Sequence, residues 1–315
     1  MSVAKTNRSH LAAVAQALFV TFLWSTSWVL IKFGLRSDLP PVTFAGLRYT
    51  LAFLCLLPVV LFNGEHRKTI RELPKAQWGE LIVLGLLYYT LAQGSQFVGL
   101  ALLPAPTLTL LLNFSPIFIA VYSMYSIHER TSLLQWGGIF ITVVGALVYF
   151  LPLSLEGGQT LGLLAAFVGV TSNAAAAVLG RKVNSHGRIS PIVVTTISMG
   201  VGGVLMLVIG VGVQGIRVLT LQQWAIIGWL ALVNTAFAFT LWNKSLQTLT
   251  AVESGIINST MLPQITILAW IFLGETINGK QMLGLACVVA GILVVQLWRY
   301  LPISKNKTLE TGENV

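Results

Sequence analysis

The stretch ALLPAPTLTLLLNFSP, residues Ala101–Pro116, decides the fold because a related stretch, TLTAVESGIINSTMLP, returns at residues Thr248–Pro263. The two final prolines lie 147 residues apart (263 − 116). Beyond them each copy continues through a glutamate and two glycines: Glu129, Gly138 and Gly145 in the first, and Glu275, Gly284 and Gly291 in the second. Each copy predicts an apolar helix with a mid-span proline, a glutamate-containing turn, and a second helix whose glycines permit close packing. A repeat this long indicates duplicated halves rather than a solenoid.

The composition predicts that the chain lies in a lipid bilayer. Of its 315 residues, 9% are charged and 55% are hydrophobic, and the mean hydropathy is +0.81. A water-soluble domain carries about 25% charged residues. Apolar runs such as Leu11–Ile31 are continuous over ~20 residues, which favours helices over the alternating strands of a β-barrel. The net charge of +9 does not indicate nucleic-acid binding, because the bases lie in short loops between the runs.

The apolar runs predict ten membrane spans. In order they are Leu11–Phe33, Val42–Phe62, Trp78–Phe97, Ala101–Tyr125, Leu133–Leu151, Leu161–Leu179, Pro191–Val213, Trp224–Trp242, Ala251–Leu273 and Met282–Trp298. The chain then divides into a tail (1–10), a first five-helix repeat (11–151), a linker (152–160), a second repeat (161–298) and a tail (299–315). The first run is too long for the apolar core of a signal peptide, and no small-residue cleavage site follows it.

Basic residues predict that both termini are cytoplasmic. With the N-terminus inside, fourteen bases fall in inner segments: Lys5, Arg8, Arg67, Lys68, Arg71, Lys75, Arg130, Arg181, Lys182, Arg188, Lys244, Arg299, Lys305 and Lys307. Four fall in outer segments: Lys32, Arg36, Arg217 and Lys280. This asymmetry follows the positive-inside rule for a cell (inner or plasma) membrane. Because each repeat has five spans, the second enters the membrane upside down. The expected fold is an all-α membrane protein with ten transmembrane helices in two inverted five-helix repeats around a central cavity.

Seven short motifs follow one another along the chain. They are Leu23-Trp24-Ser25-Thr26-Ser27-Trp28, Gly46-Leu47-Arg48-Tyr49, Ser115-Pro116, His128-Glu129-Arg130, Leu241-Trp242-Asn243-Lys244, Leu262-Pro263 and Leu273-Gly274-Glu275-Thr276. In this order they resemble the EamA-type transporters of the drug/metabolite transporter superfamily, over about Ala12–Val295. The resemblance implies ten helices in two inverted halves, a central substrate cavity, and export of metabolites or amino acids. The motifs do not carry the identity of the substrate.

Polar and aromatic residues inside the spans are the candidate substrate contacts. The breaks at Pro116 and Pro263 free backbone carbonyls, which neighbouring polar side chains either satisfy or share with a substrate. Trp24 and Trp28 share one helix face and either stack on a substrate or pack against other helices. The candidates are Trp24, Ser27, Trp28, Arg48, Tyr88, Gln93, Asn113, Ser115, Asn173, Asn234, Trp242, Asn258 and Thr260, with Pro116 and Pro263 as kink and gating positions.

Arg48 and Glu253 are charged residues inside predicted spans, where ionisable groups are rare and often functional. Arg48 either binds an anionic group of the substrate or caps carbonyls, and its repeat counterpart is Ser198. Glu253 is the candidate coupling residue. It either pairs with Lys244, senses protons or a cationic substrate, or supplies negative charge to a helix N-terminus. Small multidrug members of the resembled superfamily couple protons through a first-helix glutamate, but Leu11–Phe33 contains no carboxylate.

These features predict a secondary transporter, an exporter of small metabolites such as amino acids or related amphiphilic compounds, working by alternating access between two inverted repeats. A multidrug exporter and a nucleotide-sugar or nucleoside-type carrier are alternatives within the superfamily. A sugar-nucleotide carrier would need several bases near the cavity, where Arg48 and Lys244 are the candidates. A channel is the non-carrier alternative, and it would show charged or carbonyl-rich rings.

No enzyme, cofactor, metal site or nucleic-acid partner is expected. The spans hold no convergent set of nucleophile, base and metal ligands. The histidines have no metal-ligand spacing and fall in predicted inner loops: His10, His66, His128 and His186. The expected partners are the lipid bilayer and a small-molecule substrate, and the sequence leaves monomer and homodimer open.

Overall fold

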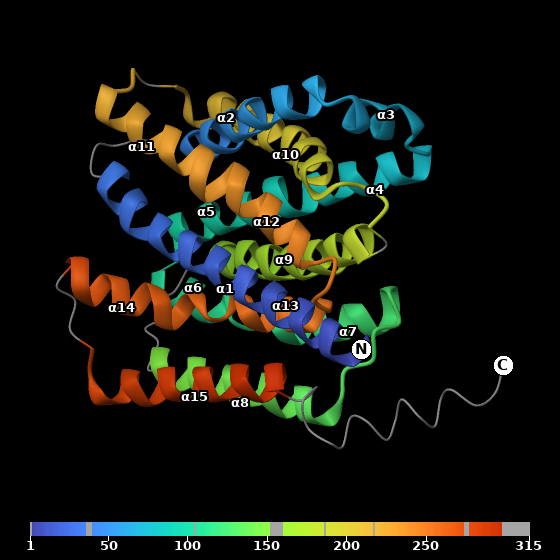
Figure 1. The fold of residues 1–315 in the computed structure, drawn as a ribbon. Helices are drawn as coiled ribbons and strands as arrows, with labels where there is room; N and C mark the ends of the chain where they lie inside the picture. The colour runs from blue at the N-terminus through green and yellow to red at the C-terminus, as the bar shows by residue number, and fades with distance from the viewer. Residues whose placement is uncertain are drawn as a thin grey trace.

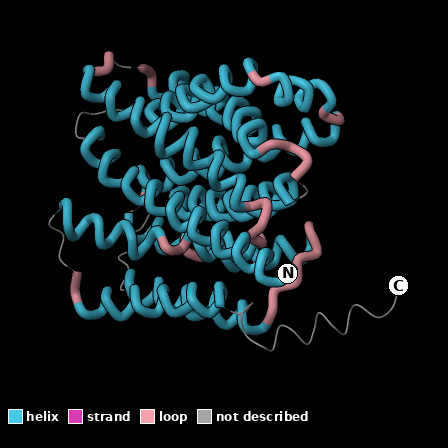
Figure 2. Tube along the Cα trace, in the orientation of Figure 1, coloured by secondary structure: helices cyan, strands magenta, loops and turns pink. Residues whose placement is uncertain are grey.

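The computed structural model describes residues 2–35, 40–103, 105–151, 160–185, 187–216, 218–273 and 277–297. These residues form helices joined by short loops, without a strand among them (Figure 2). The helices are α1 (Ser2–Leu35), α2 (Pro41–Phe62), α3 (Gly64–Glu72), α4 (Lys75–Gly85), η1 (Leu86–Ala92), α5 (Gln93–Leu102), α6 (Ala105–Leu112), α7 (Ser115–Ser126), α8 (Leu133–Phe150), α9 (Thr160–Ser185), α10 (Pro191–Gln214), α11 (Leu221–Ala231), η2 (Leu232–Phe237), α12 (Ala238–Ser245), α13 (Ala251–Asn258), α14 (Met261–Leu273) and α15 (Gly279–Leu297).

The described helices are those of a membrane protein, as the composition predicts. Eight helical runs within the described residues are long and apolar enough to cross a bilayer, and Leu110–Ser126 is a shorter apolar run. The structure also places a helix, α3, in the charged segment between the second and third predicted spans. Asn63 begins it by accepting hydrogen bonds from the backbone N–H groups of Glu65 and His66.

Both predicted breaks at proline are confirmed. One falls between α6 and α7 and the other between α13 and α14. Pro116 and Pro263 each lie in the first turn after the break, where a missing N–H leaves no helical bond unmade. The start predicted for the fourth span is wrong, because Ala101 and Leu102 belong to α5. Leu103, which precedes a proline, has an extended backbone and ends α5, as the steric clash with a following proline favours.

Two π-helical segments interrupt the spans predicted at Trp78–Phe97 and Trp224–Trp242. η1 joins α4 to α5, and η2 joins α11 to α12. The segments begin at Leu86 and Leu232, which are 146 residues apart (232 − 86), so they occupy corresponding places in the two halves. Such widened turns are rare and are frequently found at functional sites.

Two helix pairs, each with one member from each half, form the closest contacts. Figure 1 shows α2 and α10 on one side of the molecule and α8 and α15 on the opposite side, with α1 and α9 between them. A Cβ added to Gly145 on α8 would lie 2.7 Å from the main-chain oxygen of Gly284 on α15. A Cβ on Gly210 of α10 would lie 2.7 Å from the main-chain nitrogen of Thr43 on α2. The close packing predicted for the repeated glycines is therefore confirmed for α8 and α15.

Candidate substrate-binding site

Six aromatic side chains from α1, α2, η1 and α12 meet in one buried group, which we call the aromatic cluster. Its members are Trp24, Tyr49, Tyr88, Tyr89, Phe239 and Trp242. The ring centroid of Phe239 lies 4.8 Å from that of Trp24, 5.2 Å from that of Tyr89 and 5.4 Å from that of Tyr88. The rings meet in tilted and edge-on arrangements, which are favourable geometries for aromatic pairs. The rings fill the space between α1, α2, η1 and α12.

Arg48 lies beside the aromatic cluster on α2, with 8% of its surface exposed. Its Nε donates to Thr235 Oγ1 at 2.6 Å, and its Nη2 donates to the main-chain oxygen of Asn234 at 3.2 Å. The guanidinium carbon is 5.6 Å from the ring centroid of Tyr49. A guanidinium has five N–H donors, and the ion pairs found among the described residues do not include Arg48. Carbonyl capping, one of its two predicted roles, is seen at Asn234, and the charge remains available to an anionic ligand.

The widened turn η2 supplies the acceptors for Arg48. Thr235 Oγ1 donates to the main-chain oxygen of Leu230, five residues earlier, at 2.8 Å. The hydroxyl proton of Thr235 is therefore used in a hydrogen bond within the helix. A lone pair on the same oxygen accepts a hydrogen bond from Arg48 Nε. The π turn thus supplies two oxygen acceptors, Thr235 Oγ1 and the main-chain oxygen of Asn234, to a buried arginine.

Two further polar atoms in the same neighbourhood lack a hydrogen-bond partner among the residues that the structure describes. They are Nε1 of Trp24 and Oδ1 of Asn234. Trp24 is 8% exposed and Asn234 is 0% exposed. The amide nitrogen of Asn234 donates to the main-chain oxygen of Leu23 and to Thr26 Oγ1, which fixes the orientation of the amide. A buried donor and a buried acceptor without partners lose free energy unless a ligand or water pairs with them.

A second polar contact joins α1 to the break between α13 and α14. Thr21 Oγ1 and Thr260 Oγ1 are 3.0 Å apart, and Nε2 of Gln264 lies 3.2 Å and 3.3 Å from them. Ser25 Oγ donates to Oε1 of Gln264 at 2.9 Å. Thr260 Oγ1 also donates to the main-chain oxygen of Ile257, so it satisfies a carbonyl next to the break. This group connects α1 to the break without a charged residue.

The structure brings together five of the predicted site residues and places the others on different elements. Trp24, Arg48, Tyr88, Asn234 and Trp242 lie in or beside the aromatic cluster. Thr260 lies in the α1–α14 contact, and Asn258 near it has a buried Oδ1 without a hydrogen-bond partner. Gln93 lies on α5, Asn113 and Ser115 at the α6–α7 break, and Asn173 on α9. Ser115 donates across the break to the main-chain oxygen of Leu112, the last residue of α6, and Ser27 donates to that of Leu23 on its own helix, α1. The side chain of Trp28 lies outside the described part of the structure.

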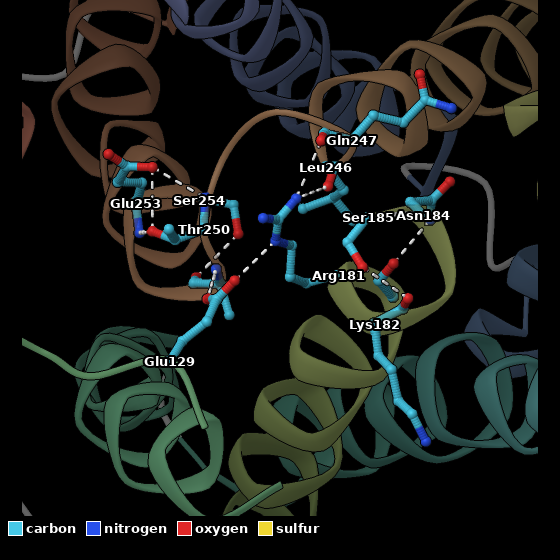
Figure 3. Close-up of polar contacts among 12 residues, drawn as sticks. Glu129, Arg181, Lys182, Asn184, Ser185, Leu246, Gln247, Thr250, Glu253 and Ser254 are labelled. Carbon is cyan, nitrogen blue, oxygen red and sulfur yellow. Dashed lines mark hydrogen bonds and ion pairs between the residues drawn. The ribbon is translucent and has the colours of Figure 1, made fainter. Parts of the chain in front are cut away.

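Glu129, from the repeated proline–glutamate pattern, connects three elements at the end of the bundle where α9 finishes and α13 begins (Figure 3). Its Oε1 accepts from Nε of Arg181 at 2.8 Å, and its Oε2 accepts from the backbone N–H of Ala251 at 3.0 Å. Arg181 also donates to the main-chain oxygens of Leu246 and Gln247. Glu129 therefore caps the N-terminus of α13, where the helix dipole favours negative charge. Glu275, its repeat counterpart, lies outside the described residues.

Glu253 does not contact Lys244 among the bonds that the structure describes, contrary to one predicted role. Its Oε2 accepts from the backbone N–H of Thr250 at 2.9 Å, and Thr250 Oγ1 accepts from the N–H of Glu253 at 3.2 Å, a capping box. The predicted helix N-terminal role is thereby confirmed. Its Oε1 lies 3.2 Å from Nε2 of His10. The placement of His10 in a loop is wrong: it lies on α1 and is 5% exposed, because α1 continues eight residues before His10 to Ser2.

Comparison with known proteins assigns the family. The model of the EamA-like transporter family matches residues 11–151 and 160–297. The chain belongs to the EamA-like transporter family. This EamA protein is 27% identical to "Uncharacterized transporter YvbV" of Bacillus subtilis, over 88% of this chain and 89% of the relative. It is 26% identical to a "Probable amino-acid metabolite efflux pump" of Salmonella typhimurium, over 88% of this chain and 92% of the relative. A solved structure with 18% sequence identity covers 92% of this chain and 99% of its own at a TM-score of 0.78, and so shares the fold.

Sequence reasoning missed several residues of the candidate site, among them Tyr49, Gln264 and Phe239. Tyr49 follows Arg48 within a motif quoted for the family, so the motif itself was a signal. Gln264 follows Pro263 directly, and a polar residue at a helix break was a second available signal. Phe239, which lies against four other rings, had no signal, because a phenylalanine in an apolar span is indistinguishable from lipid-facing or packing residues.

Proposed function

We propose that this EamA protein is a secondary transporter that exports small amphiphilic metabolites bearing a carboxylate, such as amino acids or related compounds. The proposed location is the cell membrane. The observation that carries the substrate class is Arg48, a buried guanidinium that has no carboxylate partner among the described residues. The name of the Salmonella relative supports export of this class of compound.

The proposed binding mode uses the polar atoms that the protein leaves without partners. A substrate carboxylate accepts hydrogen bonds from Arg48 and Nε1 of Trp24, since charge-assisted bonds to a guanidinium are among the strongest in proteins. An amino group donates to Oδ1 of Asn234. The apolar part of the substrate lies against the aromatic cluster, which must rearrange its rings to make room.

We further propose that the protein has ten spans in two inverted repeats and that transport proceeds by alternating access. The helix contacts support this symmetry: α1 packs on α12 and α14, and its repeat counterpart α9 packs on α5, α6 and α7. The paired π segments η1 and η2 support it as well. The positive-inside rule supports a cytoplasmic location for both termini.

An aromatic wall also suits a flat nucleoside or a planar drug, so these carriers are the second candidate function. The aromatic cluster favours them, whereas the unpaired charge of Arg48 favours an acidic group on the substrate. A channel is less consistent with the site, because buried rings fill the space between α1, α2, η1 and α12.

Counterflow in proteoliposomes tests this proposal. Proteoliposomes that contain the purified protein are loaded with one unlabelled compound at a time. Uptake of a labelled aromatic amino acid into them is then followed. We expect saturable counterflow with zwitterionic amino acids and weaker counterflow with the amines that lack their carboxylate. Counterflow with nucleosides or cationic drugs alone would support the second candidate. Flux that does not saturate with concentration would support a channel.

A further inference from the structure

A recess on the short helix α3, which we call the basic recess, lies apart from the proposed substrate site. It has a volume of about 350 Å³ and is lined by Gly64, Arg67, Lys68, Arg71 and Glu72. The spacing of these positions, alternately three residues and one residue, places them on one face of the helix. The lining therefore presents three basic side chains and one carboxylate on a single face.

The helix that carries the recess is held firmly against the bundle. Asn63 caps its N-terminus by accepting from two backbone N–H groups. Ile70 and Leu73 pack against a buried apolar cluster that includes Val60 of α2 and Leu81 of α4. Figure 1 shows α3 at the right-hand edge of the bundle, where α2 ends and α4 begins. The basic face is thus displayed on a helix whose apolar residues are fixed by packing.

The charges of the recess favour an anionic ligand. Arg67 and Arg71 are exposed, and the ion pairs found among the described residues do not include them. Lys68 lies 4.0 Å from Glu72, and both side chains are largely exposed, so this pair is weak. Three bases against one acid leave the recess positive. Guanidinium groups bind phosphate oxygens through paired charge-assisted hydrogen bonds.

The apolar end of α2 beside the recess indicates which phosphate compound fits it. Leu61 and Phe62 lie just before α3 and are 48% and 88% exposed. Because α2 is long and apolar enough to cross a bilayer, its end at Phe62 lies near a membrane surface. A ligand with both a phosphate group and hydrocarbon chains can contact the bases and this apolar end together. A phospholipid has this combination, and a free phosphate does not.

We propose that the basic recess binds the phosphate group of an anionic phospholipid, with Arg67 and Arg71 as the main donors and the acyl chains against the exposed end of α2. The site is separate from Arg48 and does not rest on the class of compound that is transported. A zwitterionic phospholipid offers the same phosphate with a quaternary ammonium group, which the bases repel. The recess should therefore prefer phosphatidylglycerol to phosphatidylcholine.

The test is native mass spectrometry of the full-length protein in detergent, with dioleoyl phosphatidylglycerol or dioleoyl phosphatidylcholine added at equal concentrations. The measured quantity is the ratio of protein that carries one lipid to free protein. We expect this ratio to be higher for phosphatidylglycerol in the parent. One base near an anionic lipid contributes a factor of about five, so Arg67→Gln/Arg71→Gln should lower the phosphatidylglycerol ratio by roughly 5- to 25-fold. The phosphatidylcholine ratio should change by less than about twofold.

A matched variant separates a defined site from general attraction between charges. Arg130→Gln/Lys244→Gln removes two exposed bases from other segments and should change the phosphatidylglycerol ratio by less than about twofold. Equal losses in the two double variants, or a parent without preference for phosphatidylglycerol, would overturn the proposal. Displacement of the lipid by an equal concentration of sn-glycerol 3-phosphate would also overturn it, because the recess would then bind a soluble phosphate. Arg71→Gln alone, with an expected loss of about fivefold, decides if the double variant is not monodisperse.

Discussion

Gly145→Val tests whether direct backbone contact holds α8 against α15. A Cβ at Gly145 would lie 2.7 Å from the main-chain oxygen of Gly284 and 2.7 Å from the main-chain nitrogen of Val288. Backbone atoms cannot rotate away, so the two helices must separate by roughly 1 Å to reach ordinary contact distances. The separation weakens dispersion contacts along the whole pair, and overpacking of this kind costs about 1–3 kcal/mol.

For a chain of this length that loss corresponds to a melting temperature lower by about 2–5 °C. The assay heats detergent-solubilised protein and measures the surviving monodisperse peak by size-exclusion chromatography. Gly137→Val is the matched control, since it makes the same change in the same helix and its added Cβ meets nothing within 4 Å. Equal melting temperatures for the two variants would refute the reasoning.

Three further predictions address topology, the helix breaks and Glu129. Cysteines placed at Thr69 and Gln214 should react with an impermeant thiol reagent from opposite sides of the membrane, the one at Thr69 from the cytoplasm. Reaction of both cysteines from one side would contradict the inverted arrangement. Pro263→Ala should leave the protein folded but lower counterflow severalfold, because the break at Ser259 positions the α1–α14 contact; unchanged counterflow would remove that role. Glu129→Gln should destabilise the protein by about 1 kcal/mol, because it loses an ion pair and weakens a helix cap. Glu80→Gln, at a more exposed ion pair, should have a smaller effect on the melting temperature, and equal effects would contradict the capping role.

Local sequence signals predicted the features of the fold that depend on neighbouring residues. Continuous apolar runs marked the helices, and the prolines marked the breaks, because proline is tolerated in the first turn of a helix but disrupts its interior. The glycine pair of α8 and α15 followed from the repeat, since residues at matching positions of two halves meet at a symmetric contact. The π segments could not be predicted, because no residue type specifies a widened turn within an apolar helix.

The candidate site depends on contacts between residues far apart in the chain. Such contacts could not be predicted from the sequence. Arg48 was identified as unusual from its charge, but its partner Thr235 is 187 positions away. The contact of His10 with Glu253 spans 243 positions and was missed, because His10 was assigned to a tail rather than to α1. Both contacts require the packing of α1 and α2 against the second half, which hydropathy alone does not specify.

The central claim, that Arg48 binds the carboxylate of the substrate, is tested most directly by counterflow of an amino acid and of the amine that lacks its carboxylate. Arg48→Gln removes a charge-assisted hydrogen bond worth about 1.5–3 kcal/mol, so the half-saturating concentration of the amino acid should rise by about 10- to 150-fold. Arg48→Lys keeps the charge but lacks the planar guanidinium. Its half-saturating concentration for the amino acid should lie between those of the parent and of Arg48→Gln. Transport of the amine by Arg48→Gln should change by less than about threefold, since it makes no bond to Arg48. Equal losses for the amino acid and the amine, together with a lower melting temperature, would contradict the claim and leave Arg48 as a structural cap of η2.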